Sequence, residues 1–457
     1  MDKPIDKHGH IPLWCETLLE ERGDIQVWIG AKHSVEESPN PPEGRTGLIE
    51  VGKYPIGWVC KFKGELYGAY INIDEDSPKS TKGPIGVLLQ NAEKSMKAIK
   101  AKQSIKKTLL LTGASGFIGS HFLEHVLTKT DWEVICLCSW KHKGTPERIE
   151  EVLTGNSTWR DRVTVITHDL ETPLTQRTMD RIGIVDYIVN FAAESHVDRS
   201  IETPVSFIQN NVNLMLSMLE FARTQKSLQM FVQVSTDEVY GVAPEGINHK
   251  EWAPILPSNP YSASKAAQEA IAIAYWRTYK IPLVITNTMN NFGEMQDPEK
   301  YVAQLIRKIH NGKTVSVHGT EKSIGSRYYL HARNHADAVL FLLRTLTKYM
   351  CIYEGGDGDY RERDKEVQTL RSRFPQRFNV VGDVELNNLE MAQLVAELMG
   401  KPLSYEFTDF HATRPGHDKR YALDGTKLQS FGWKPPLEFK ESLKKYIDWT
   451  LKHPTWL

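Results

Sequence analysis

The sequence predicts an α/β protein with a doubly wound parallel sheet, a smaller α/β part toward the C-terminus and an extra β-rich region at the N-terminus. Between residues 108 and 288, short apolar runs alternate with helix-like runs, as in parallel sheets covered by helices on both faces. A glycine-rich turn joins the first apolar run to the first helix-like run, and a later apolar run ends in adjacent hydroxyl and carboxylate side chains. Together these features predict a nucleotide-binding sheet whose strand ends carry catalytic groups.

The composition is that of an ordinary globular protein and argues against several classes of function. The chain has 457 residues, of which 40% are hydrophobic and 25% charged, so two or three domains are expected. Lys and Arg total 56 against 57 Asp and Glu, without the basic excess of a nucleic-acid-binding protein. No apolar run approaches the roughly 20 residues of a membrane span, and the N-terminus lacks the apolar core of a signal peptide. We expect a cytoplasmic protein without a membrane or nucleic-acid partner.

The five cysteines are scattered and odd in number. Cys136 and Cys138 lie on the same face of an apparent buried strand, and a metal site would need further ligands nearby. The sequence therefore predicts buried thiols in a reducing compartment and no metal site.

Residues 1–85 are predicted to form a β-rich N-terminal addition. Four short β-like runs, at 24–29, 46–51, 56–62 and 66–73, are separated by Gly, Pro and Asn, as in a small antiparallel sheet. Residues 86–107 follow as a lysine-rich helical connector with a solvated basic face. No catalytic group is apparent in either segment, so the chemistry is expected in residues 108–457.

The glycine-rich turn lies between a strand at residues 108–112 and a helix-like run at 120–127, the context that a dinucleotide-binding fingerprint requires. In its G-x-x-G-x-x-G spacing, the first glycine permits the tight turn, the second lets backbone approach a pyrophosphate, and the third allows close helix–strand packing. With a second strand at 133–138, the pattern predicts a Rossmann domain over residues 108–289. The candidate cofactor contacts in the turn are Gly113, Ser115, Gly116, Phe117, Ile118 and Gly119.

Two further strand ends supply candidate ligand contacts. The strand at 163–167 is followed by Asp169, placed to meet an adenine amino group, and by Leu170. The strand at 185–191 ends in Ala192 and Ala193, whose small side chains let the backbone lie against the cofactor. His196 follows shortly after and is a candidate ligand contact.

The end of the second strand bears on which dinucleotide binds. In Rossmann folds an acid at this position binds the ribose 2′-hydroxyl and repels a 2′-phosphate. Here the strand ends at Cys138 and no acid occurs before Glu147, while Ser139, Lys141 and Lys143 supply a hydroxyl and two positive charges. The prediction is NADP as the favoured cofactor; the alternative is NAD, with the lysines as solvated loop residues.

The catalytic candidates lie at the end of the next strand and on the helix after it. The strand ends in Thr236, Asp237 and Glu238, and a helix-like run downstream begins with Tyr261 and Lys265, which share one helix face because they are four apart. A cationic neighbour lowers the pKa of a phenol, so Tyr261 is a candidate acid/base with Lys265 as its electrostatic partner. Adjacent carboxylates facing one substrate repel, so one of the two should keep its proton.

Residues 290–457 are predicted to be mainly the substrate-binding part, interleaved with the Rossmann domain. Asn290 and Asn291 follow a buried strand at 282–288. Arg327, Arg414 and Arg420 are candidates for binding a diphosphate, because guanidinium groups match phosphate geometry. Residues 352–376 are charged and glycine-rich, which predicts an exposed insertion.

From about residue 107 to residue 457 the sequence resembles the extended short-chain dehydrogenase/reductases, and within them the dTDP-glucose 4,6-dehydratases. The matching stretches are TGASGFIGS, NFAAESHVDRSI, VSTDEVYG, YSASK, NNFG, PEK and RPGHDKRYALD. The chain departs from that pattern at Cys138, where the family has Asp, and at Tyr328 and Tyr329, where it has Asp and Trp. Residues 332–335 read Ala-Arg-Asn-His instead of Val-Glu-Asp-His, and residues 1–100 have no recognised counterpart.

The resemblance implies a nucleoside-diphosphate-hexose 4,6-dehydratase, acting on dTDP-glucose and keeping a tightly bound, recycled cofactor. The sugar is oxidised at C4, loses water across C5 and C6, and takes the hydride back at C6. The family pattern implies that Tyr261, supported by Lys265, deprotonates the C4 hydroxyl, whose oxygen is hydrogen-bonded by Thr236. It implies that Glu238 removes the C5 proton and that Asp237 donates to the leaving C6 hydroxyl. The implied substrate contacts are Ser195, His196, Asn290, Asn291, Glu299, Lys300, Arg327, Arg414 and His417.

Two other functions stay open. A nucleotide-sugar 4-epimerase or decarboxylase of the same fold would share the Tyr-Lys pair, although the Thr-Asp-Glu triplet separates this chain from them. A non-catalytic nucleotide-sensing protein would keep the fold, but it need not keep all five catalytic candidates.

A homodimer is also expected, since extended members of this superfamily commonly dimerise through two helices, here those that follow Pro204 and Tyr261. Apolar residues recur at helical spacing in the first of these helices, which suits a buried face; they could equally pack on their own sheet. These residues are Phe207, Val212, Met215, Met218 and Leu219.

Overall fold

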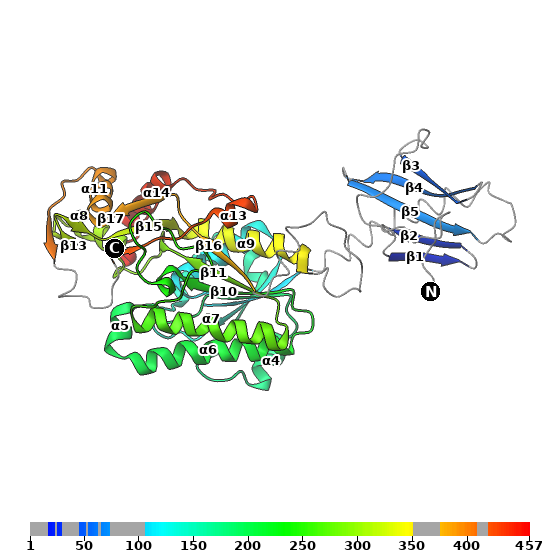
Figure 1. The fold of residues 1–457 in the computed structure, drawn as a ribbon, viewed down its shortest axis with the longest axis horizontal. Helices are drawn as coiled ribbons and strands as arrows, with labels where there is room; N and C mark the ends of the chain where they lie inside the picture. Colours follow the sequence, from blue (N-terminus) through cyan, green and yellow to red (C-terminus); the bar gives the residue numbers. More distant parts are fainter. Residues whose placement is uncertain are drawn as a thin grey trace. The chain divides into compact units, whose positions relative to one another are not determined.

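The computed structural model describes residues 106–350, 375–408 and 419–457, and the backbone of five strands between residues 17 and 73 (Figure 1). The chain divides into two compact units, residues 1–105 and 106–457. Most of the predicted connector and of the predicted insertion lies outside the described residues, and so do Arg414 and His417. No described helix combines the length and the apolar character that a membrane span needs.

The described strands of the N-terminal unit form one antiparallel sheet. They are β1 (Thr17–Arg22), β2 (Ile25–Ile29), β3 (Arg45–Val51), β4 (Tyr54–Phe62) and β5 (Glu65–Ile73), in the order β1-β2-β5-β4-β3. Four of these strands match the predicted runs. The fifth, β1, was not predicted, because half of its six residues are charged and it lacks the alternating pattern of a strand.

The larger unit is built on a seven-stranded parallel sheet, the predicted doubly wound arrangement. Its strands are β6 (Thr108–Thr112), β7 (Glu133–Cys138), β8 (Val163–Thr167), β9 (Tyr187–Asn190), β10 (Met230–Thr236), β11 (Leu283–Thr288) and β16 (Gln376–Val380). Their order is β16-β11-β10-β9-β6-β7-β8, so the chain reverses direction across the sheet next to β6. At such a switch point the strand ends leave a crevice where ligands bind.

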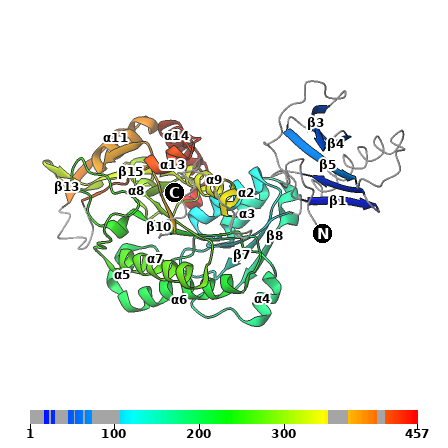
Figure 2. The same cartoon turned by 45° about the vertical axis from the view of Figure 1, so that its right-hand side comes forward.

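Helices cover both faces of this sheet (Figures 1 and 2). One face is covered by α2 (Phe117–Lys129), α3 (Pro146–Thr154) and α9 (Ala332–Met350), and the other by α4 (Gln176–Ile182), α6 (Pro204–Thr224) and α7 (Pro260–Tyr279). Successive residues of β6 alternate between the two faces: Leu109 and Leu111 lie in the first core and Leu110 in the second. Cys136 and Cys138 are both buried in the first core, as predicted.

The apolar positions of α6 are occupied within this unit. Met215, Met218 and Leu219 are fully buried in the core between α6 and the sheet. Phe207 is also buried and contacts the Tyr261 ring edge-on, with 6.3 Å between ring centroids. For Met215, Met218 and Leu219 the helical spacing is therefore explained by packing on their own sheet, the second of the two interpretations given above, whereas Val212 is only partly buried.

Residues after β11 form a second part with its own core. One small sheet holds β12 (Asn290–Phe292), β15 (Ser326–His331), β17 (Val384–Asn387) and β19 (Arg420–Tyr421), and another holds β13 (Val315–Thr320), β14 (Ser323–Ile324) and β18 (Tyr405–Thr408). Helices α8 (Tyr301–His310), α11 (Asn388–Met399) and α14 (Phe439–Lys452) pack in the same core. Helix α9 and strand β16 come from the same stretch of sequence but return to the main sheet.

Candidate active site

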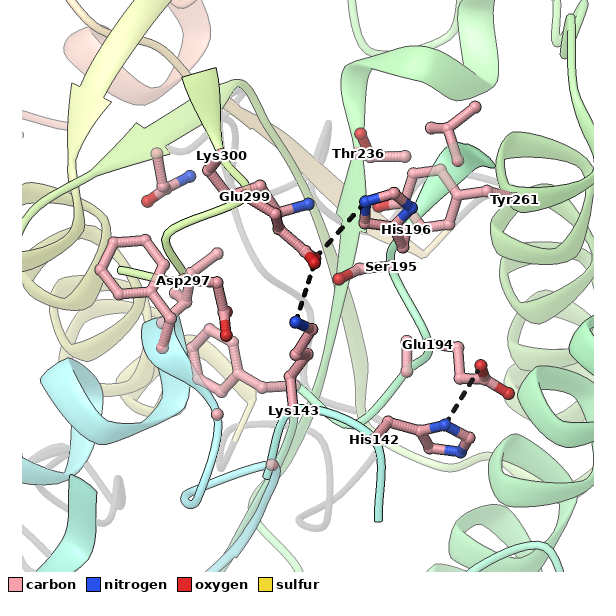
Figure 3. A pocket seen from close by; sticks show the side chains of 18 of the residues that line it. His142, Lys143, Glu194, Ser195, His196, Thr236, Tyr261, Asp297, Glu299 and Lys300 are labelled. Carbon is pink, nitrogen blue, oxygen red and sulfur yellow. Dashed lines mark ion pairs between the residues drawn. The ribbon is translucent and has the colours of Figure 1, made fainter. Parts of the chain in front are cut away.

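A cavity of about 900 Å³ opens at the carboxyl ends of the main-sheet strands (Figure 3). Apart from Arg420, it is lined by every candidate cofactor, catalytic and substrate residue that lies in the described part of the chain. Arg414 and His417 fall outside that part. Arg420 does not line the cavity: its guanidinium Nε lies 2.7 Å from Glu385 Oε1, which holds the side chain elsewhere, so its prediction as a diphosphate ligand is wrong.

The glycine turn has the geometry that the predicted roles require. Gly113 adopts a φ of +72°, and a Cβ there would lie 2.9 Å from the Ala192 backbone nitrogen. A Cβ on Gly119 would lie 2.1 Å from the Gly113 carbonyl oxygen, so only glycine lets the helix pack this close to the turn. Helix α2 begins at Phe117, three residues earlier than predicted, so the free N–H groups of its first turn belong to the glycine motif itself.

The catalytic triplet sits where β10 passes into a short 3-10 helix, Asp237–Tyr240. Thr236 Oγ1 donates to Asp237 Oδ1 at 2.9 Å, and the Asp237 side chain is buried. Burial and the neighbouring charge of Glu238 raise the pKa of Asp237 to about 7. Asp237 is therefore the carboxyl that keeps its proton near neutral pH.

Glu238 is held by two side chains that sequence reasoning did not identify. Its Oε2 accepts from Asn259 Nδ2 at 3.3 Å and from the Tyr421 hydroxyl at 3.4 Å. Asn259 is the residue before α7, and Tyr421 lies on β19, within the stretch RPGHDKRYALD that carried part of the resemblance. A polar residue at each of these places was visible in the sequence, but nothing there indicated that both reach the same carboxylate.

Tyr261 and Lys265 lie on α7, which begins at Pro260. Lys265 Nζ donates to the Val234 carbonyl oxygen at 2.7 Å, and burial lowers the pKa of this lysine to about 8. The pKa of Tyr261 is raised well above its ordinary value, first by burial and then by the charge of Glu238. The prediction that Lys265 depresses the pKa of Tyr261 is therefore wrong for the protein alone, because burial and the nearby carboxylates dominate.

The loop after β7 places three consecutive side chains on three carboxylates from other elements. Lys141 pairs with Asp169. His142 Nδ1 lies 3.4 Å from Glu194 Oε2, and Lys143 Nζ lies 2.8 Å from Glu299 Oε2 (Figure 3). The backbone turns through two left-handed residues, Trp140 and His142, at φ values of 57° and 55°. The two lysines expected beside a 2′-phosphate are thus each paired with an acid.

Glu299 joins the two walls of the cavity. Besides its pair with Lys143, its Oε1 lies 3.4 Å from His196 Nε2 (Figure 3). The pKa of Glu299 is lowered: burial is its largest single cause and acts to raise it, but the bonded Lys143 together with the charges of His196 and Lys300 outweighs burial. The pKa of His196 is also lowered, with burial as the largest cause. Arg327, on the substrate side, stacks over the Tyr421 ring at 4.4 Å.

A family model described as GDP-mannose 4,6 dehydratase matches residues 110–446. This chain belongs to that family. The GDP-mannose 4,6-dehydratase family match leaves the N-terminal unit outside, and it confirms the predicted group of extended nucleotide-sugar dehydratases.

Relatives of this family member support the same grouping. The chain is 33% identical over 345 residues to the low-salt glycan biosynthesis protein Agl12 of Haloferax volcanii, covering 75% of this chain and 98% of that protein. It is 33% identical over 367 residues to a dTDP-glucose 4,6-dehydratase of Xanthomonas campestris, covering 77% and 95% respectively. The crystal structure of DesIV, a dTDP-glucose 4,6-dehydratase from Streptomyces venezuelae with NAD and TYD bound, matches with a TM-score of 0.63 and 30% identity, covering 76% of this chain and 98% of that one.

Proposed function

We propose that this chain is a nucleoside-diphosphate-hexose 4,6-dehydratase and that dTDP-glucose is its substrate. The observation that carries the proposal is one cavity in which Thr236, Asp237 and Glu238 meet Tyr261 and Lys265. An epimerase needs only the Tyr-Lys pair for oxidation and reduction at one carbon, whereas elimination of water needs a further base and a further acid. The dTDP-glucose 4,6-dehydratases among the relatives support the choice of substrate.

The C5 proton of a hexose is not acidic until C4 is a ketone, so oxidation must come first. A bound oxidised nicotinamide supplies the hydride acceptor for C4 and the hydride for C6, together with a positive charge that favours a phenolate. Tyr261 accepts the C4 hydroxyl proton, and Thr236 donates a hydrogen bond to the C4 oxygen. The raised pKa of Tyr261 in the protein alone keeps this base protonated until the ligands are present.

The elimination step divides between the two carboxyl groups. Glu238, fixed by Asn259 and Tyr421, takes the proton from C5. Asp237 holds a proton near neutral pH and gives it to the C6 oxygen as the C6–O bond breaks, so one water leaves. Glu238 thus acts as the base and Asp237 as the acid, because Asp237 is buried whereas Glu238 is only partly buried.

The cofactor is a nicotinamide dinucleotide, bound by the glycine turn and the N-terminus of α2. The missing acid at the end of β7 supports NADP, the form favoured from the sequence. Against it stand the pairing of Lys141 with Asp169 and of Lys143 with Glu299, and the NAD bound to DesIV. Denaturing the purified protein and identifying the released dinucleotide by mass decides between them; NAD alone, with no NADP uptake on reconstitution, overturns the NADP preference.

We also propose a homodimer built on α6 and α7, which pack side by side on one face of the sheet. Because Met215, Met218 and Leu219 face the sheet, the contact would use the opposite sides of these helices. Light scattering at micromolar concentration tests this; a monomeric mass contradicts it.

The function is tested by incubating the protein with a panel of nucleotide hexoses. The expected result is loss of one water from dTDP-glucose, detected by mass. Conversion to an isomer of unchanged mass would identify an epimerase, and no change with any sugar would contradict the assignment as an enzyme of this class.

A further inference from the structure

A buried ion pair lies behind the catalytic groups and takes no part in the chemistry proposed above. Arg377 on β16 places Nη2 2.6 Å from Glu269 Oε2 on α7, and the two side chains are 1% and 0% exposed. Removing two charges from water is costly, and such a pair can often be replaced by apolar groups without loss of stability. Stability alone therefore does not explain why an ion pair lies behind the catalytic groups.

The pair is connected to the catalytic strand end by hydrogen bonds. Asn287 on β11 donates through Nδ2 to Glu269 Oε1 at 2.8 Å and to the Thr236 carbonyl oxygen at 3.0 Å. Arg377 Nη1 donates to the Glu251 carbonyl oxygen at 3.0 Å, which fixes the guanidinium from the other side. Both side-chain oxygens of Glu269 are thus bonded, one to Asn287 and one to Arg377, one helical turn from Lys265.

Lys265 is itself buried, with 4% of its surface exposed. The buried residues of α5 (Val197–Glu202) and α6 include no ionisable side chain. On its own helix the ionisable residues one turn away are Tyr261 and Glu269, and Glu269 is paired with Arg377. The strand β10, whose Val234 carbonyl oxygen accepts from Lys265, leads into Asp237 and Glu238. Burial lowers the pKa of Lys265 to about 8, and the charge of Glu269 is what opposes that fall.

We propose that Glu269, clamped by Arg377, is the counter-ion that keeps Lys265 protonated at the catalytic site, so that both are positioning residues for the oxidation step. The proposal rests on the catalytic role given to Lys265 above. It assigns a role to a strand, β16, that contributes no residue to the cavity wall.

The test is the pH profile of kcat for Glu269→Gln in the full-length protein with its bound cofactor. Loss of the negative charge should make Lys265 lose its proton at lower pH, so the alkaline limb should move to lower pH by about one unit or more, a tenfold change in the charged fraction at a given pH. KM should change little, because neither Glu269 nor Arg377 lines the cavity. Glu269→Asp, which restores the charge, should return the limb toward that of the parent.

The double variant Glu269→Gln with Arg377→Met separates this role from a structural one. It removes both charges and leaves neither unpaired, so its stability should exceed that of either single variant. If the pair serves only folding, the double variant recovers the parent profile and the proposal is overturned. If the pair keeps Lys265 protonated, the alkaline limb of the kcat profile stays at lower pH in the double variant although its stability has returned.

Leu343→Ala is the matched control for destabilisation. Leu343 is fully buried on α9, in the core on the opposite face of the sheet, so its loss should weaken folding without moving the limb. A displaced limb in this control would also overturn the proposal. Failure of the proposed function shows itself separately, as a parent protein that dehydrates no nucleotide hexose.

Discussion

Asp237 and Glu238 are adjacent in the sequence, yet their surroundings suit them to opposite tasks. Asp237 is buried and accepts a hydrogen bond from Thr236. Glu238 is only partly buried and accepts two hydrogen bonds from neutral donors. The division of labour between acid and base is thus set by position within a single turn of 3-10 helix.

The raised pKa of Asp237 makes stability depend on pH. The folded state holds this proton up to about pH 7, whereas the unfolded chain releases it near the ordinary value of 3.8, so the contribution is present below that value and is lost as pH rises toward 7. Asp237→Asn should therefore gain about 3 kcal/mol relative to the parent between about pH 5 and about pH 8. Urea unfolding of both proteins at the two pH values measures this difference in the free energy of unfolding. Asp161→Asn, at an exposed site, is the control. An equal pH dependence of stability in all three proteins would contradict the raised pKa of Asp237.

Glu238→Gln should separate oxidation from elimination. The glutamine keeps hydrogen-bonding capacity toward Asn259 and Tyr421 but cannot take the C5 proton, so the sugar should be oxidised and reduced cofactor should accumulate. Turnover should fall by about 10²–10⁴-fold, the range of a lost general base. The absorbance of reduced nicotinamide in a single turnover follows this step. Water release at the parent rate would show that another group is the base.

The residues that line the cavity were largely predictable, because hydroxyls, carboxylates and glycines at the ends of parallel strands meet at one edge of a sheet. The pKa values and the ion pairs of the cavity were not predictable from the sequence. The pKa of Tyr261 depends on its burial and on Glu238, which is 23 residues away in the sequence. The pairing of Lys143 with Glu299 likewise joins segments whose proximity only the fold reveals.

At the scale of elements, the residue that caps α7 also contacts the proposed base, Glu238. Asn259 accepts from the Ser262 backbone N–H at 2.9 Å, and the Ser262 hydroxyl bonds back to Asn259, forming a capping box. The same Asn259 side chain donates to Glu238. One residue thus begins the catalytic helix and orients the proposed base.

Substitutions of Asn259 should separate these two tasks. Asn259→Ala should lose about 1 kcal/mol of stability and lower kcat, because both the cap and the bond to Glu238 disappear. Asn259→Ser should recover the stability, since serine also caps helices, but its shorter side chain should leave kcat low. Thermal unfolding and steady-state kinetics on the two variants provide the comparison. Full recovery of kcat in the serine variant would mean that the bond to Glu238 is unimportant.

The strands of the main sheet up to β11 were predicted to within a few residues, because each is a short apolar run beside a turn signal. Helix α9 and strand β16 were missed. They flank the stretch predicted as an insertion, so the alternation of strand and helix is interrupted just where the last strand of the sheet is supplied.

At the scale of the whole molecule, the two compact units predict that the catalytic unit folds by itself. Deleting residues 1–85 should leave a protein that unfolds cooperatively and retains its dinucleotide, because every described residue of the cavity belongs to residues 106–457. Circular dichroism during heating and mass analysis of the released cofactor test this. A truncated protein that is insoluble or free of cofactor would show that the N-terminal unit is integral to the fold.

Strand β16 is also synthesised long after the strand and the acid that it pairs with. Glu269 leaves the ribosome 108 residues before Arg377, a delay of roughly 5–20 seconds at about 5–20 residues per second. During that time the edge of β11 that later pairs with β16 has no partner strand, and an open edge invites pairing with other chains. Translation that stops within residues 351–374 would release a chain with the catalytic triplet and Tyr-Lys pair complete, yet with its sheet unfinished and its buried acid unneutralised.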